Sequence, residues 1–191
     1  KRFGVKTLTN VADAKRLCPE IVLVESRPTV YVEFHQKAKA VVESVAPIAA
    51  VNSIDEMWIR LGGRDQPRPA AEGLAREIKY RLRQQLGECI TCSVGIAPNT
   101  FLAKTASDMV KPDGLVVIEP GDLPDVLMPL KLNHFVGIGR KMLQRLNDHG
   151  ITSTPQLLAA DIAKLRDVWG GVEGERFWQK LRGEDVQQRE T

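Results

Sequence analysis

The order of strand-like and helix-like runs up to residue 118 is the feature that most constrains the fold. Short apolar runs typical of strands lie at residues 21–24, 48–54, 57–61, 91–96 and 115–118. Apolar residues at helical spacing lie between them, at residues 30–45, 70–86 and from Asn99, as N-cap, to about residue 109. This is not the strict alternation of a doubly wound sheet. The order predicts an α+β fold with a mixed sheet and helices on one face, as in ferredoxin-like folds.

The character of the chain changes after Glu119-Pro120-Gly121. Residues 122–186 contain no convincing strand, only short helical segments broken by glycine pairs. A further short helix is predicted at residues 11–17, ending before Cys18-Pro19, because the residue before a proline is pushed out of the helical region. We therefore expect a domain boundary near residue 119, between an α+β part and an all-helical part.

Composition excludes some classes of protein and leaves others open. The chain has 191 residues, of which 43% are hydrophobic, so it can bury a core and is not a disordered chain. Its net charge of +3 is unevenly spread: residues 1–118 carry 17 basic and 13 acidic residues, whereas residues 119–191 carry 10 and 11. Charge alone supports nucleic-acid binding only weakly. Any DNA contact in the second half has to come from local geometry.

The cysteines and the hydropathy pattern indicate an ordinary cytoplasmic protein. Cys18, Cys89 and Cys92 are too few for a disulfide framework. A zinc site at Cys89 and Cys92 would need a second ligand pair, and the histidines are scattered at positions 35, 134 and 149. We therefore expect reduced cysteines. No apolar run reaches 18 residues and no signal-peptide pattern opens the chain.

Two adjacent carboxylates, Asp55 and Glu56, lie between two strand-like runs. Hard oxygen ligands of this kind suit Mg²⁺, and a pair of such ions can clamp the attacking and leaving oxygens of a phosphoryl transfer. Successive residues of a flat strand face opposite ways, so both can serve one site only if the chain bends there. The alternative is a solvent-exposed turn that happens to hold two acids.

A second candidate site follows the strand-like segment that ends at Asn99. A capped helix leads there to the turn Lys111-Pro112-Asp113-Gly114. This turn fixes the direction of Lys111, which could meet a nucleotide triphosphate. A surface lysine in a common turn is the alternative. Lys104, inside the helix, is interpreted as a solvated or structural residue.

The third candidate, Val136-Gly137-Ile138-Gly139 followed by Arg140 and Lys141, has the pattern of a helix-hairpin-helix element. Its glycines let the backbone approach a phosphate, and the N–H groups at the helix start favour an anion. Such contacts position a duplex without reading its sequence. A glycine-rich link between packed helices is the alternative. Residues 170–174 resemble a degenerate second hairpin whose acidic residues make it a poorer phosphate site.

Taken in order, these segments resemble the Y-family (translesion) DNA polymerases, a group that includes bacterial DNA polymerase IV. The resemblance is carried by residues 1–6, 14–19, 53–56, 93–114 and 136–139. It implies partial fingers at residues 1–28, an incomplete palm at 29–118 and a helical thumb at 119–191. It also implies lesion bypass by two-metal nucleotidyl transfer.

The resemblance further assigns roles to single residues. Asp55 and Glu56 are implied to be two of three metal-binding carboxylates, holding two Mg²⁺ ions in the complete protein. Lys111 is implied to contact the incoming triphosphate. Lys1 stands where many members have an arginine with that role, and Thr100 stands where many have a lysine.

The implied partners are primer-template DNA and deoxynucleotide triphosphates, with a sliding clamp reached through regions outside this chain. We expect a monomeric bacterial protein, acting in the cytoplasm at the nucleoid and not at a membrane. The family's first metal-binding aspartate and its little-finger domain lie outside the chain, which we therefore interpret as a fragment that is inactive alone. Two alternatives remain: a non-catalytic relative acting as a DNA-binding adaptor in a mutagenesis complex, and a helix-hairpin-helix module joined to an unrelated domain.

Overall fold

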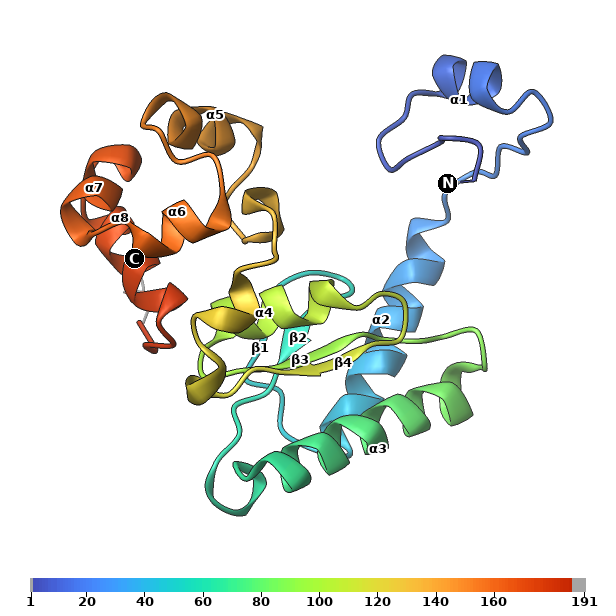
Figure 1. Cartoon of the computed structure of the whole chain (residues 1–191). Helices are drawn as coiled ribbons and strands as arrows, with labels where there is room; N and C mark the ends of the chain where they lie inside the picture. The colour runs from blue at the N-terminus through green and yellow to red at the C-terminus, as the bar shows by residue number, and fades with distance from the viewer. Residues whose placement is uncertain (1, 187–191) are drawn as a thin grey trace.

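The structure, a computed structural model, describes residues 2–186 in three parts (Figure 1). A small N-terminal part holds helix α1 (Val11–Leu17) and stands apart from the rest at one end of helix α2 (Pro28–Glu43). Four short strands and the helices around them form the centre, and the C-terminal helices form a separate cluster. Lys1 lies outside the described residues.

The strands form two separate pairs in the described part of the chain. β1 (Ala50–Val51) and β2 (Met57–Trp58) are antiparallel, and β3 (Val94–Ile96) and β4 (Leu115–Val117) are parallel. No ladder joins the two pairs among residues 2–186. The expected α+β class is confirmed, but the single mixed sheet is replaced by one pair of each kind, and the strands are shorter than their apolar runs.

The strand predicted at residues 21–24 is wrong. These residues are extended but pair with no strand, and Val22 and Val24 are 80% and 82% exposed. A β-branched run favours a strand only where a neighbouring strand and a buried face receive it. The described residues provide neither at this point.

Helices cover both faces of the strands, contrary to the expectation of one face. α2 packs against α3 (Arg68–Leu86) through Val41, Val42, Ile78 and Leu82, and Met57 packs against this cluster. On the other side lies α4 (Thr100–Met109), the crossover of the parallel β3–α4–β4 unit (Figure 1). A parallel pair needs such a crossover, and its helix has to cover one face.

Gly95 in β3 allows α4 to lie very close to the strand. A Cβ atom at this position would be 1.9 Å from the carbonyl oxygen of Ala103 and 2.5 Å from the amide nitrogen of Ser107. No side chain fits there without moving backbone. The approach of helix to strand therefore depends on glycine at this position.

The C-terminal part is helical, as expected. It contains α5 (Arg140–Asp148), α6 (Thr154–Ala159), α7 (Ile162–Trp169), α8 (Val172–Leu181) and single 3₁₀ turns at Pro120–Asp122, Asp125–Leu127 and Leu132–His134. One further 3₁₀ turn, at Gly63–Asp65, precedes α3. The core of the C-terminal helices is continuous with the buried face of α4, where Leu102 and Ala106 are fully buried.

Asn99 joins α4 to the C-terminal helices. Its Oδ1 accepts a hydrogen bond from the amide of Leu102 at 2.8 Å, which confirms the predicted N-cap. Its Nδ2 donates to the carbonyl oxygens of Lys180 and Glu184, both at 2.9 Å. Next to it, the ring of Phe101 packs edge-on against Phe177. One buried amide thus satisfies the start of one helix and the end of another.

Candidate active site

The two adjacent carboxylates lie at a tight hairpin, as their use in one site requires. The amides of Asn52 and Ser53 donate to the carbonyl oxygen of Glu56 at 2.9 and 3.2 Å, so the chain reverses between β1 and β2. Asp55 is exposed at the tip, where its Oδ1 accepts a hydrogen bond from the hydroxyl of Ser53 at 2.6 Å. The bend meets the condition under which both carboxylates can serve one site.

His35 on α2 contacts the backbone of this hairpin. Its Nδ1 lies 2.7 Å from the carbonyl oxygen of Ile54. A carbonyl oxygen only accepts, so this nitrogen carries the proton and donates. Sequence reasoning saw His35 only as one of three scattered histidines, because its partner is 19 residues away and no local pattern links them.

An alternating chain of four charges connects the hairpin to the turn after α4. The Nζ of Lys104 lies 2.6 Å from Oε1 of Glu56 and 3.2 Å from Oδ2 of Asp108. The other oxygen of Asp108 lies 2.6 Å from Nζ of Lys111. Lys104 is thus a paired, half-buried residue, which agrees with its interpretation as a structural residue and not a ligand. The structure brings Glu56 and Lys111 into one network through two residues of α4.

The pKa values of the two middle residues reflect this pairing. Burial disfavours the charged form of Lys104, but its hydrogen bonds with Glu56 and Asp108 outweigh this and raise the pKa of its ammonium. Burial likewise opposes ionisation of Asp108, but the hydrogen bonds from Lys111 and Lys104 prevail and lower the pKa of its carboxyl. Both groups are therefore charged at neutral pH.

The turn that carries Lys111 is anchored by a residue that sequence analysis did not single out. The Nζ of Lys79, on α3, donates to the carbonyl oxygens of Cys92 and Asp113 and to Oδ1 of Asp113, at 2.7, 2.8 and 2.6 Å. Asp113 has φ near +60°, a conformation that costs energy for a residue with a side chain. The hydrogen bond from Lys79 also lowers the pKa of Asp113. Lys79 therefore fixes the backbone next to Lys111.

Two carboxylates are a partial set of metal ligands. Among residues 2–186 no group of three or more histidine, cysteine or acidic side chains lies close enough to hold a metal ion. Asp55 and Glu56 nevertheless offer hard oxygens, and a lysine ammonium already stands against Glu56 as a cation would. The residues therefore fit part of a magnesium site. Cys89 and Cys92 form no disulfide, and burial raises the pKa of the Cys92 thiol.

The predicted helix-hairpin-helix segment has the backbone of an anion-binding helix start. The segment turns at Gly137, with φ of +88°, and α5 begins after Gly139, whose missing side chain leaves the first amides without a side-chain cap. Arg140 and Lys141 in the first turn are exposed, and no acidic residue accompanies them there. The element before the hairpin is a 3₁₀ turn, not a full α-helix.

The second hairpin, between α7 and α8, is a poorer anion site, as its sequence indicates. Glu173 and Glu175 lie in the first turn of α8. They are paired with Arg176 and Arg166, respectively. The negative charge of the two acids at this helix start disfavours an added phosphate, and their ion pairs already occupy the two arginines.

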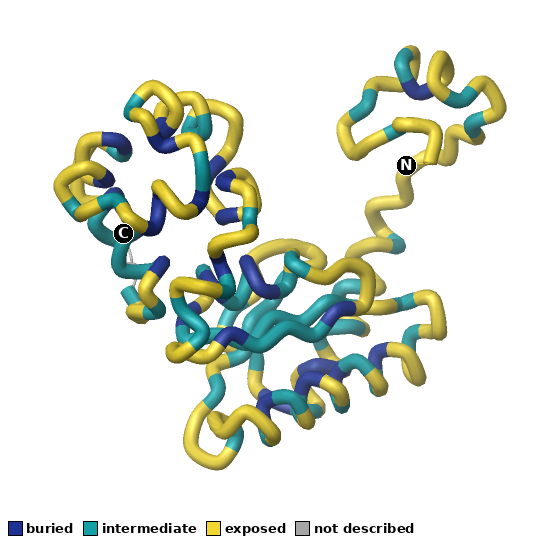
Figure 2. The backbone as a smooth tube through the Cα atoms, in the orientation of Figure 1, coloured by how far each residue is buried: buried dark blue, intermediate teal, exposed yellow. Residues whose placement is uncertain are grey.

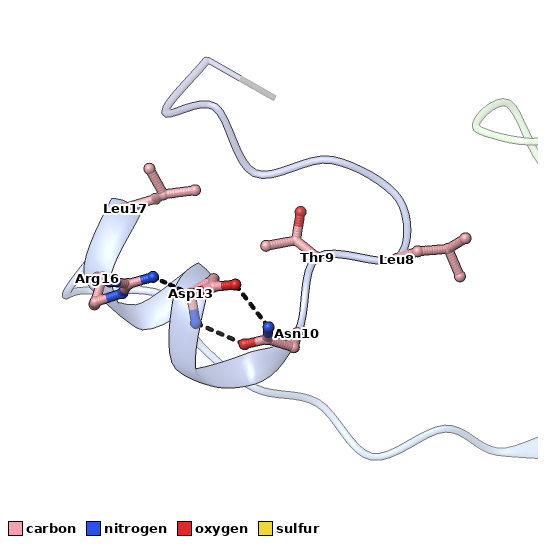
Figure 3. Close-up of a pocket in the computed structure, with 6 residues that line it drawn as sticks. All are labelled: Leu8, Thr9, Asn10, Asp13, Arg16 and Leu17. Carbon is pink, nitrogen blue, oxygen red and sulfur yellow. Dashed lines mark hydrogen bonds and ion pairs between the residues drawn. The ribbon is translucent and has the colours of Figure 1, made fainter. Parts of the chain in front are cut away.

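A shallow pocket lies elsewhere, in the N-terminal part. Figure 3 shows the side chains that line it around the start and end of α1, among them Asp13, which accepts hydrogen bonds from Asn10 and Arg16. None of the candidate metal-binding, triphosphate-binding or DNA-binding residues among residues 2–186 lines it. Among the described residues, no helix is long and apolar enough to cross a membrane.

Comparison with known proteins gives a consistent result. Residues 1–108 match the impB/mucB/samB family and residues 120–151 match the helix-hairpin-helix motif of the same family. DNA polymerase IV of Moorella thermoacetica is 34% identical over 96% of this chain and 45% of its own length. DNA polymerase IV of Aeromonas hydrophila is 38% identical over 93% of this chain and 51% of its own length.

Solved structures agree. A Y-family DNA polymerase chimera superimposes with a TM-score of 0.85 at 28% identity, over 99% of this chain and 55% of that one. DinB from Sulfolobus solfataricus gives a TM-score of 0.75 at 30% identity, over 95% of this chain and 52% of that one. The chain thus spans about half the length of the relatives that it matches, and the resemblance to Y-family polymerases is confirmed. On these matches, and with the hairpin that carries Asp55 and Glu56 (the acidic hairpin) preceding the helix-hairpin-helix segment as expected, the chain belongs to the impB/mucB/samB family.

Proposed function

We propose that this chain is the catalytic centre and duplex-holding part of a DNA-directed DNA polymerase that synthesises past damaged template bases. The observation that carries the proposal is the network from the acidic hairpin, Glu56, through α4 to Lys111. It joins Glu56, the proposed metal-binding carboxylate, and Lys111, the proposed triphosphate contact, by ion pairs through Lys104 and Asp108. DNA polymerase IV relatives over nearly the whole chain support the same reading.

In this proposal each candidate residue has a defined task. Asp55 and Glu56 bind Mg²⁺, two ions being held once a further carboxylate completes the set; the ions stabilise charge on the attacking and leaving oxygens. Lys111 contacts the triphosphate of the incoming deoxynucleotide, held in place by the turn that Lys79 anchors. Lys1 remains a proposed second triphosphate contact and lies outside the described residues.

The helical part is proposed to hold the primer-template duplex. The backbone of Val136, Gly137, Ile138 and Gly139 approaches a phosphate, and Arg140 and Lys141 add positive charge. The proposed division is fingers at residues 1–28, palm at 29–118 and thumb at 119–191. The protein is further proposed to be a monomer that acts in the cytoplasm. A sliding clamp is proposed as an additional partner of the whole protein.

Primer extension tests the function. The full-length protein is given primer-template DNA, Mg²⁺ and the four deoxynucleotide triphosphates, alongside a variant with Asp55→Ala and Glu56→Ala. We expect extension by the unchanged protein and at least a hundredfold loss in the variant, since metal ligands act in the transition state. If both proteins bind the DNA and neither extends it, the chain belongs to a non-catalytic adaptor. We expect no extension by the 191-residue chain alone, because its described residues bring only two carboxylates together.

A further inference from the structure

The pairing between Lys104 and Glu56 differs from the lysine–carboxylate pairs of α2, and unlike the long-range pair of Lys79 with Asp113 it engages a proposed metal ligand. Lys37–Glu33 and Lys39–Glu43 are pairs within one helix turn of α2. Lys104 instead reaches from α4 to the acidic hairpin and touches Glu56 at 2.6 Å, with 31% of its side chain exposed. It therefore occupies a carboxylate that the proposed function needs for a divalent cation.

An ammonium and a divalent cation compete for the same oxygen of Glu56. Both are cations that bind a carboxylate oxygen at short range, and like charges so close repel strongly. A cation at Oε1 of Glu56 therefore has to displace Lys104. The structure provides a place for it to go, because Oδ2 of Asp108 already lies 3.2 Å from the same Nζ.

The second acceptor also reaches Lys111. Asp108 holds Lys111 through its other oxygen at 2.6 Å. When Lys104 leaves Glu56, its charge concentrates on Asp108 and weakens the hold of that carboxylate on Lys111. Arrival of a cation at the hairpin would therefore release the lysine that is proposed to meet the triphosphate.

We propose that Lys104 is an internal counter-ion that occupies Glu56 in the absence of metal and yields it to a divalent cation by moving onto Asp108. Lys104 is then a positioning residue, since it acts through Glu56 and Asp108 without touching substrate. The proposal rests on the proposed function, in that Glu56 is a metal ligand. A purely structural ion pair makes the opposite prediction, because its loss would loosen the hairpin and weaken cation binding.

Mn²⁺ binding to the 191-residue chain distinguishes the counter-ion from a purely structural ion pair. The binding is followed through the electron paramagnetic resonance signal of the free ion. Lys104→Gln is expected to bind Mn²⁺ about fivefold more tightly than the unchanged chain, the effect of removing one partly exposed ion pair. Asp108→Asn is expected to bind about two- to fivefold more weakly, because Lys104 loses its alternative acceptor and stays on Glu56. Adding Glu56→Gln to Lys104→Gln is expected to remove the gain.

Matched controls separate this effect from a change in net charge. Lys37→Gln and Glu33→Gln make the same charge changes in an exposed pair of α2 and are expected to leave Mn²⁺ affinity within about twofold of the unchanged chain. Circular dichroism checks that every variant is folded, and Lys104→Met replaces Lys104→Gln if the latter is not.

The proposal is overturned if folded Lys104→Gln binds Mn²⁺ no better than the unchanged chain, including the case in which neither binds it. Failure of the proposed function has a different signature: primer extension by the full-length protein that survives Asp55→Ala and Glu56→Ala. That result would leave the Mn²⁺ measurements on the chain as they stand.

Discussion

The C-terminal helices and the N-terminal residues use their apolar side chains very differently. From α4 onward, Leu102, Leu146, Leu157 and Leu165 are completely buried in one continuous core. Before α2, Leu8, Val22 and Val24 are 98%, 80% and 82% exposed (Figure 2). Since the free energy of burial follows the apolar area removed from water, most of the stabilisation resides in the C-terminal half.

The comparison shows where the candidate site is supported. α4, which supplies Lys104 and Asp108, belongs to the large core. The acidic hairpin belongs to the smaller cluster of α2 and α3, in which Met57 is half-buried. The site lies where a firmly packed helix faces a lightly packed hairpin, so perturbing each side should have separate effects.

Truncating a core leucine should have the largest effect. Leu165→Ala removes a completely buried side chain and leaves a cavity, at an expected cost of about 2–5 kcal/mol in the free energy of unfolding. Val22→Ser, in the exposed segment, should change it by less than about 0.5 kcal/mol. Urea unfolding followed by circular dichroism measures both. Similar costs for the two variants would mean that the regions do not differ in stability.

Asn99 should rank next, because it joins α4 to the end of α8 within the well-packed region. Asn99→Ala removes three hydrogen bonds of a buried amide, at an expected cost of about 2–3 kcal/mol. Asn99→Asp keeps the helix cap but turns a carboxylate toward the carbonyl oxygens of Lys180 and Glu184. It should therefore remain destabilised by at least about 1 kcal/mol. If Asn99→Asp were as stable as the unchanged chain in urea, the link to α8 would contribute nothing.

Two helical glycines should respond in opposite directions. A Cβ at Gly174 in α8 would lie 2.0 Å from the carbonyl oxygen of Leu165, so Gly174→Ala should destabilise by about 1–3 kcal/mol as the helices are pushed apart. Gly73 in α3 has open space around it, so Gly73→Ala should stabilise by up to about 1 kcal/mol. Thermal melts of both variants show whether each substitution raises or lowers the melting temperature. Two shifts in the same direction would contradict the difference in packing around Gly174 and Gly73.

The smallest expected effect is a pH dependence at the boundary of the two regions. Because the pKa of Asp108 is lowered on folding, its contribution to stability is present above the unfolded value of about 3.9 and is lost as the pH falls through the folded value. The group is one-third exposed, so the contribution should be below about 1 kcal/mol. Asp108→Asn should flatten the acid limb of a stability–pH curve relative to the unchanged chain. An identical limb would show that Asp108 is unpaired in solution.

Sequence reasoning succeeded where the signal was local. The cap of α4 at Asn99 and the helix at Val11–Leu17 followed from residues within a few positions of one another. A bend at Asp55 and Glu56 was the condition under which both carboxylates could serve one site, and the structure meets that condition. In each case neighbouring residues alone set the conformation.

The misses share a different cause. The strand expected at residues 21–24 depended on a partner strand, and the second face of helices depended on the route of the crossover. The contacts of Lys79 and His35 join residues far apart in sequence. From the sequence alone, each side chain would be predicted to lie on the solvent-exposed face of its helix. A single polar residue that contacts a distant element produces no repeating pattern in the sequence, so periodicity cannot predict its partner.

The close approach at Gly95 has a consequence for how this site tolerates change. α4 lies directly on β3 there, and the same helix carries Lys104 and Asp108. Any larger residue would lift the helix and alter the spacing of the whole ion-pair chain at once. A screen for inactive variants should therefore recover position 95 as readily as the charged residues, although a glycine performs no chemistry of its own.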